Sequence, residues 1–158
     1  MELILCALFK STETITMNTS TTNHGAFLTR ITLGSILLAH GALKIFVFTI
    51  PGTVGFFGSL GLPAIVAYLT IFGEVAGGAA LILGIYPRLV ALLSLPILLG
   101  AAWVHSGNGW LFSNEGGGWE FPVLLVVLSI VVAIQGAGSF AIKQIPGVDR
   151  LIPARLKV

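Results

Sequence analysis

The chain has 158 residues, of which 56% are hydrophobic and 9% are charged, and its formal net charge is +2. Soluble globular proteins carry roughly 25% charged residues, and a larger core does not account for so great a shortfall. The composition, with a mean hydropathy of +1.01, therefore excludes a soluble domain and indicates an integral membrane protein. The small positive charge does not indicate nucleic-acid binding. The single cysteine, Cys6, excludes an intramolecular disulfide and a C-x-x-C redox motif.

Residues 1–26 are expected to form a flexible N-terminal tail. The segment from Ser11 to Asn23 is rich in Ser, Thr and Asn, a composition typical of unstructured chain. The apolar residues before it are too few to span a bilayer, and they lack the basic region and cleavage site of a secretory signal. Met17 offers a second start, so residues 1–16 either belong to the protein or extend it artificially.

Four apolar segments predict an all-α, four-helix membrane bundle over residues 27–142. The spans are expected at about 27–50, 63–84, 89–105 and 119–138. The second would be roughly 33 Å long at about 1.5 Å per residue, close to the thickness of a hydrocarbon core. The uncharged loop 51–63, rich in Gly and Phe, is expected to rest at the membrane interface. Pro96 predicts a kink near Ser94.

The distribution of charge predicts the orientation of this bundle. Arg30, Arg88 and the basic segment 143–158 fall on one side of four spans, and the other two loops contain only Glu115. Because cytoplasmic loops are rich in Lys and Arg, both termini are expected in the cytoplasm. The loops 51–63 and 106–118 would then face outward.

Ionisable residues of the spans define one outward-facing polar layer. Glu74 lies in the middle of the second span, where a charge costs about 3 kcal/mol or more and normally has a partner. His40 and Lys44 lie one helical turn apart on one face of the first span. His105 ends the third span and Glu120 begins the fourth on that same side. The layer predicts a polar pocket with Glu74 at its floor and Lys44 and His40 as its nearest contacts.

Each of these residues also has a structural interpretation. Lys44 or His40 could pair with Glu74 only to hold two helices together. His105, Glu120 and Trp119 could be interfacial groups, since Trp and polar residues mark membrane–water boundaries. No short ligand spacing supports a metal site. The Gly73-x-x-x-Gly77 spacing is one that lets helix backbones approach closely.

Five short motifs resemble the DoxX family of small four-helix membrane proteins. They are His40–Lys44, Gly73–Gly78, Leu83–Arg88, Gly118–Glu120 and Gly136–Gly138. The resemblance covers about residues 27–143. It implies a multi-pass protein of the bacterial inner (plasma) membrane. Members are often labelled as oxidoreductases because some resemble the small subunit of a thiosulfate:quinone oxidoreductase.

The resemblance and the polar layer favour a redox-associated subunit that binds a quinone. Glu74, Lys44 and His40 would then handle protons, and His105, Glu120 and Trp119 would contact the ligand. The sequence has no flavin, haem or metal motif, so electrons would come from a partner subunit or from substrate. Two alternatives remain open: a non-catalytic scaffold or assembly partner, and a small-molecule carrier. The expected partner is the lipid bilayer. A redox partner subunit and a homo-oligomer are both possible, and nucleic acid is not expected to bind.

Overall fold

The computed structural model describes residues 19–142 and 152–157, and every regular element within them is a helix. The all-α prediction is therefore confirmed. The elements are α2 (Thr19–Ala42), the π-helix η1 (Leu43–Val47), α3 (Ile50–Ser59), α4 (Ala64–Leu83), α5 (Pro87–His105), the 3-10 turn η2 (Ser106–Asn108), α6 (Glu120–Gln135) and α7 (Ala154–Lys157).

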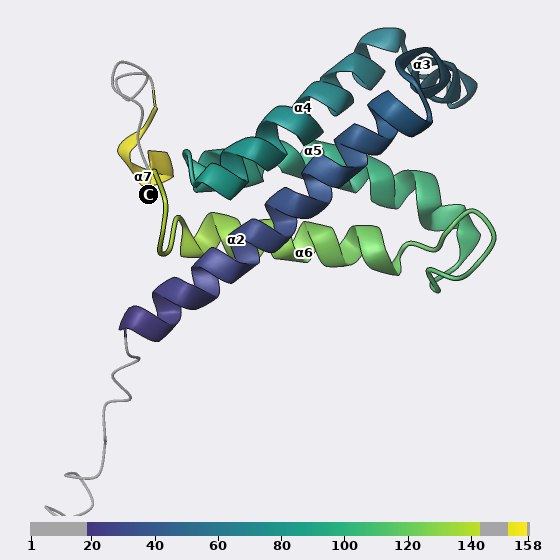
Figure 1. Cartoon of the computed structure of the whole chain (residues 1–158). Helices are drawn as coiled ribbons and strands as arrows, with labels where there is room; N and C mark the ends of the chain where they lie inside the picture. Colours follow the sequence, from purple (N-terminus) through teal and green to yellow (C-terminus); the bar gives the residue numbers. More distant parts are fainter. Residues whose placement is uncertain (1–18, 143–151, 158) are drawn as a thin grey trace, which may run out of the picture.

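Helices α2, α4, α5 and α6 form a closed bundle in which each helix packs against two neighbours (Figure 1). The contact between α2 and α4 is the most extensive of the four, and that between α2 and α6 is the least. Three segments are long and apolar enough to cross a bilayer: Thr21–Val47, Ala64–Leu83 and Pro87–Asn108. Helix α6 is apolar and shorter, with 16 residues. These helices together are the expected membrane bundle.

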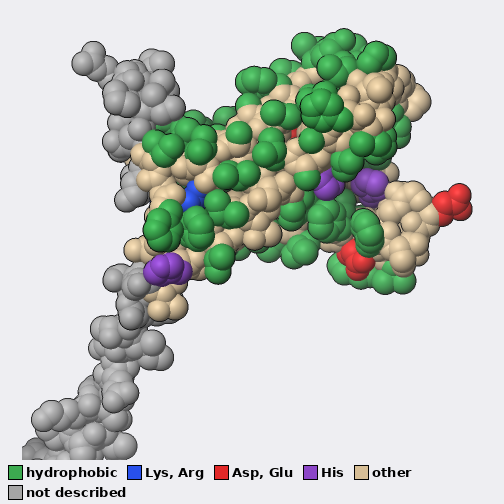
Figure 2. Space-filling view, viewed as in Figure 1, with side chains coloured by type: hydrophobic (Ala, Val, Ile, Leu, Met, Phe, Trp, Pro, Cys, Tyr) green, Lys and Arg blue, Asp and Glu red, His purple; other side chains and the backbone are tan. Residues whose placement is uncertain are grey.

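The bundle has two distinct ends (Figure 1). The start of α2, the turn between α4 and α5, and the end of α6 lie at one end. Helix α3 and the loop 106–119 lie at the other end, which we call the loop end. Hydrophobic side chains are spread along the visible side of the bundle, and acidic and histidine side chains are visible at the loop end (Figure 2). This arrangement fits a bundle that crosses a membrane, and the cytoplasmic placement of the termini stays a prediction.

Two local expectations need correction. Helix α2 begins at Thr19, inside the segment expected as a flexible tail, and residues 1–18 lie outside the described part of the chain. Residues 50–59 form helix α3 instead of a loop. Thr49 caps this helix by accepting a hydrogen bond from Gly52 N at 3.3 Å, and Pro51 suits its first turn because its missing N–H costs nothing there. Of the predicted tail 143–158, only residues 152–157 are described.

The turn that joins α4 to α5 follows from its sequence. Gly84 adopts the left-handed conformation with φ of 72°. Its N–H bonds Leu81 O, and the N–H of Ile85 bonds Ala80 O at 2.9 Å, which is the Schellman pattern for ending a helix. Pro87 then begins α5 at the position where its missing donor costs least.

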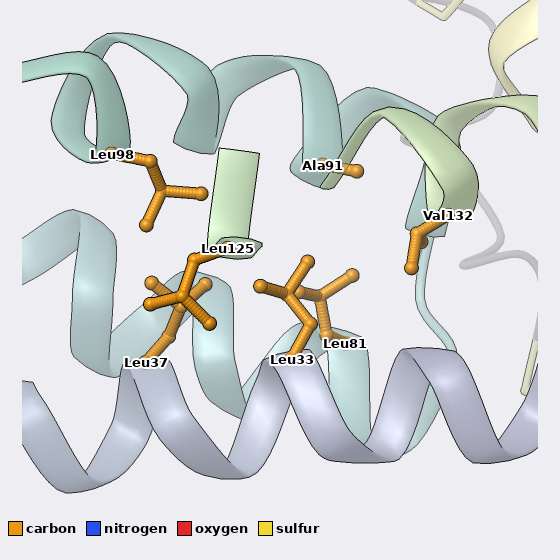
Figure 3. Close-up of a cluster of buried hydrophobic side chains, with 7 residues drawn as sticks. All are labelled: Leu33, Leu37, Leu81, Ala91, Leu98, Leu125 and Val132. Atoms are coloured by element: carbon orange, nitrogen blue, oxygen red, sulfur yellow. The ribbon is translucent and has the colours of Figure 1, made fainter. Parts of the chain in front are cut away.

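A single hydrophobic core joins the four long helices (Figure 3). Its buried members are Leu33, Leu37, Leu81, Ala91, Leu98, Leu125 and Val132. Ser129 is also buried there and donates to Ala91 O at 2.7 Å, which satisfies its hydroxyl between α5 and α6.

Glycines set the close approach of α2 to α4. A Cβ added at Gly78 would lie 2.6 Å from Leu38 N and 2.8 Å from Gly34 O, both backbone atoms of α2. Gly41 likewise leaves no room for a side chain beside Val75. The Gly73-x-x-x-Gly77 spacing does not make this contact, because a Cβ at either glycine would meet side chains of α5. Gly78, which directly follows that motif, is the glycine of α4 that allows the backbone of α2 to come close.

Arg30 ties three segments together at the end of the bundle opposite the loop end. Its side chain is fully buried within the core. The guanidinium donates to carbonyl oxygens of Leu81 and Ile82 at the end of α4 and of Ala137, Ser139 and Phe140 after α6. Helix C-termini leave carbonyls without intrahelical donors, and the fork of an arginine can satisfy several at once. Arg30 therefore has a structural role beyond its contribution to the charge bias.

Candidate functional site

Lys44 and Glu74 form a salt bridge inside the bundle. Lys44 Nζ lies 2.7 Å from Glu74 Oε1, and the two side chains are 19% and 7% exposed. It is the one salt bridge within residues 19–142 and 152–157. The other carboxylate oxygen, Oε2, is buried and accepts no hydrogen bond from these residues. The predicted partnership is thus present, and Glu74 keeps unused capacity to accept a hydrogen bond.

The π-helix η1 carries Lys44 into this position. Its signature is the hydrogen bond from Phe48 N to Leu43 O, 2.9 Å long and closed over five residues. Thr53 Oγ1, from α3, donates to the backbone carbonyl of Lys44 at 3.1 Å. Thr49 follows with a positive φ of 63°, which is unusual for a β-branched residue. Such local departures are enriched at functional sites.

The salt bridge forms part of the wall of a cavity of about 310 Å³, which we call the central cavity. Its polar lining comes from His40, Lys44, Glu74 and His105. The remaining walls are Ile36, Leu37, Ile97, Leu98, Ala101, Phe112, residues 116–118, Phe121, Pro122 and Leu125. All four long helices contribute. A mostly apolar cavity with a few convergent polar groups is typical of a small-molecule site.

Both histidines of the cavity use the same ring nitrogen, Nδ1, to contact backbone carbonyls. His40 Nδ1 lies 3.0 Å from Ile36 O, and His105 Nδ1 lies 3.0 and 3.1 Å from the carbonyls of Gly116 and Gly117. A carbonyl oxygen only accepts, so Nδ1 carries the proton in each ring. Nε2 has no hydrogen-bond partner among the described residues. In the neutral ring that nitrogen can accept a hydrogen bond from a ligand, and in the charged ring it can donate one.

The loop 106–119 folds over the loop end and closes part of the cavity. Glu120 Oε1 accepts from Phe112 N at 2.7 Å, and Asn108 Nδ2 donates to the carbonyls of Gly116 and Gly117 at 3.0 and 2.9 Å. These bonds hold Phe112 and residues 116–118 against the cavity. The rings of Trp110 and Trp119 stack edge-on with centroids 4.4 Å apart.

The structure brings together four of the six residues singled out in the sequence. His40, Lys44, Glu74 and His105 share the central cavity. The carboxylate of Glu120 instead holds the loop, and Trp119 packs on Trp110; neither lines the central cavity. Among residues 19–142 and 152–157, no cluster of three or more His, Cys, Asp or Glu side chains could hold a metal ion.

Sequence reasoning did not identify Phe112 and Phe121 as cavity walls. The ring of Phe121 stacks on His40 with centroids 6.1 Å apart and an interplanar angle of 23°. One signal was present, because Phe121 directly follows Glu120, at the loop end of α6. Phe112 had no such signal, since its place depends on how the loop folds back.

The chain is similar to a known family of proteins and to a curated protein. Residues 25–107 match the DoxX family model. A curated protein of Bacillus subtilis (strain 168), named "Putative oxidoreductase CatD", is 33% identical over 118 residues, which cover 75% of this chain and 84% of that protein. No solved structure matches the chain significantly. The part of the chain that matches the family model contains most of α2 and all of α4 and α5. It therefore includes His40, Lys44, Glu74 and His105. The chain belongs to the DoxX family.

Proposed function

We propose that the protein is a redox-associated subunit of the inner (plasma) membrane whose central cavity binds the ring of a quinone. One observation carries the proposal: the Lys44–Glu74 pair, His40 and His105 converge on one otherwise apolar cavity inside a membrane bundle. Intramembrane ionisable residues around a cavity commonly mark a ligand or proton pathway. The similarity to a protein named as an oxidoreductase supports a redox role.

The donors around the cavity suit an oxidised quinone. A quinone ring is planar and apolar, with two carbonyl oxygens that only accept hydrogen bonds. Among the described residues, Lys44 Nζ donates once, to Glu74, and an ammonium has three donors. The Nε2 atoms of His40 and His105 supply further donors when the rings are charged. Phe112 and Phe121 give the aromatic walls against which a flat ring packs.

The same groups suit the reduced ligand, which requires acceptors. Two-electron reduction adds two protons and turns both carbonyls into hydroxyls. The neutral histidines accept at Nε2, and Glu74 accepts through its carboxylate. The protons would pass through these side chains, and a partner subunit or a reduced substrate would supply the electrons.

A scaffold function is the second candidate, and one observation favours it. The Lys44–Glu74 pair links η1 to α4, so it could serve only to hold the bundle together. In that case the cavity would be a by-product of the polar layer and would bind no specific ligand.

Copurification separates the two functions. The wild-type protein is purified in mild detergent, and lipid extracts are searched for quinones by mass spectrometry. The Lys44→Met, Glu74→Gln and His40→Gln variants are compared at equal amounts of folded protein. A quinone that copurifies with the wild type and falls in all three variants supports the proposal.

The scaffold is supported if no quinone copurifies and the wild type does not bind added menadione. Lys44→Met and Glu74→Gln would then lower thermal stability, while His40→Gln would leave both stability and cellular function unchanged. That pattern would also rule out the quinone site.

A further inference from the structure

We infer that the apolar tail of the ligand leaves the central cavity between α2 and α6, through a groove that opens to the hydrocarbon of the bilayer. The inference rests on the proposed function and adds the class of ligand: a ring with a long alkyl or isoprenoid tail. The α2–α6 groove has a volume of about 860 Å³. Its lining residues are His40, Leu43, Trp110, Phe112, Glu120, Phe121, Val123, Leu124 and Val127.

The groove and the central cavity share a wall. His40, Phe112 and Phe121 line both of them. The stacked rings of His40 and Phe121 therefore stand at the junction between the polar cavity and the apolar groove. A ligand with its ring beside His40 would have the groove as an adjacent apolar space.

The groove also lies at the weakest helix contact of the bundle. Helices α2 and α6 pack less extensively than the three other neighbouring pairs. On its α6 side the groove carries Leu124 and Val127, which are 58% and 51% exposed. Exposed apolar side chains on a membrane helix face lipid, so a tail lying here would reach the bilayer without crossing water.

The two volumes favour a ligand whose ring lies in the central cavity and whose tail lies in the groove. The central cavity, at about 310 Å³, lies at the lower limit of small-molecule pockets, which suits a ring system without its tail. A tail gains little free energy from the groove, because bilayer lipid is equally apolar. The groove matters sterically: it is the space that a tail requires while the ring stays in the cavity. Closing the groove should therefore exclude tailed ligands and spare tailless ones.

Two probes test this prediction. Menadione is a naphthoquinone without a tail, and phylloquinone carries the same ring with a long phytyl tail. Binding of each to the purified full-length protein in detergent is measured by equilibrium titration. Val127→Trp and Leu124→Trp place a bulky ring in the groove at exposed positions of α6. Ile134→Trp is the matched control, since Ile134 is 71% exposed on α6 and does not line the groove.

We expect the two groove variants to weaken phylloquinone binding by about tenfold or more and to leave menadione binding and thermal stability at the wild-type level. Ile134→Trp should bind both probes as the wild type does. Unchanged phylloquinone binding in the groove variants would overturn the inference and leave the proposed function standing, as would equal losses for both probes. If the groove variants change only the amount of bound phospholipid, the groove holds an acyl chain and the inference is wrong. A wild type that binds neither probe contradicts the proposed function as well.

Discussion

Lys44 Nζ lies 2.7 Å from Glu74 Oε1 and joins the π-helix that follows α2 to the middle of α4. This contact connects the fold and the candidate site, because the same two side chains line the central cavity. The contribution of this salt bridge to the free energy of unfolding can be measured without a ligand.

The first prediction concerns this pair. Removing one partner of a buried pair leaves an uncompensated charge, which costs about 3 kcal/mol or more. Lys44→Met and Glu74→Gln should therefore each lower the free energy of unfolding. The loss should be smaller for Glu74→Gln, because the charge left unpaired, on Lys44, is the more exposed of the two (19% against 7%), and the amide oxygen of Gln can still accept a hydrogen bond from Nζ. The double variant should recover part of the loss, giving a coupling of about 1 kcal/mol or more. Thermal unfolding in detergent measures each value, and strictly additive losses would show that the pair is not coupled.

The second prediction concerns Arg30. Arg30→Met removes a donor from five carbonyl oxygens, of which Leu81 O keeps the N–H of Gly84. A buried group left unsatisfied costs roughly 1–3 kcal/mol, so the variant should unfold at lower temperature or fail to purify as a single species. Arg30→Lys should be intermediate, since its ammonium has fewer donors and no planar fork. Arg88→Met is the control, because the one hydrogen bond that Arg88 donates within residues 19–142 and 152–157 is long, 3.5 Å to Arg155 O. Size-exclusion profiles and thermal unfolding report the outcome, and a wild-type melting temperature for Arg30→Met would refute the structural role.

A third prediction tests the contact between α2 and α4. Gly78→Ala places a methyl group against backbone atoms of α2, and overpacking of this kind typically costs about 1–3 kcal/mol. Gly100→Ala is a matched control in α5, because nothing lies within 4 Å of its added Cβ. It should be neutral or stabilise by up to about 1 kcal/mol through helix propensity. Equal effects of the two substitutions on thermal stability would contradict the close approach.

The loop that covers the cavity gives a fourth prediction. Glu120→Ala removes the acceptor of Phe112 N–H, whose hydrogen bond is solvent-exposed and contributes about 1 kcal/mol. Hydrogen exchange should therefore become faster in the peptide that contains Phe112. Glu115→Ala is the control, since Glu115 is exposed in the same loop and forms no salt bridge there. Protection unchanged in Glu120→Ala would mean that the carboxylate does not hold the loop.

The bundle itself was predictable from the sequence, because apolar length and charge bias depend on composition over many residues. A basic partner for Glu74, either Lys44 or His40, was predictable for a related reason, since a charge in a membrane span needs a partner. The role of Arg30 was missed because a basic residue near a helix start reads as a topology signal. Its phase with Leu33 and Leu37, three and seven residues later, could have indicated that it faces inward.

Features that depend on tertiary contact were not predictable. The segment 51–63 was expected as a loop at the membrane interface, yet Thr49 and Pro51 begin helix α3 there. The π-helix has no sequence signature and is seen only in the hydrogen bond that spans five residues. Glu120 and Trp119 share the loop end with the cavity residues, and only the fold of the loop shows that they support it instead of lining the cavity.

Binding of menadione to the purified protein tests the central claim most directly, with Ala101→Phe as the comparison. Ala101 lines the central cavity from α5, so a phenyl group there fills the space for the ring and leaves His40, Lys44, Glu74 and His105 in place. Saturable binding by the wild type, weakened by about tenfold or more in a stably folded Ala101→Phe variant, is the predicted result. Absence of saturable binding by the wild type, or equal affinity in the two proteins, would contradict a quinone site in the cavity.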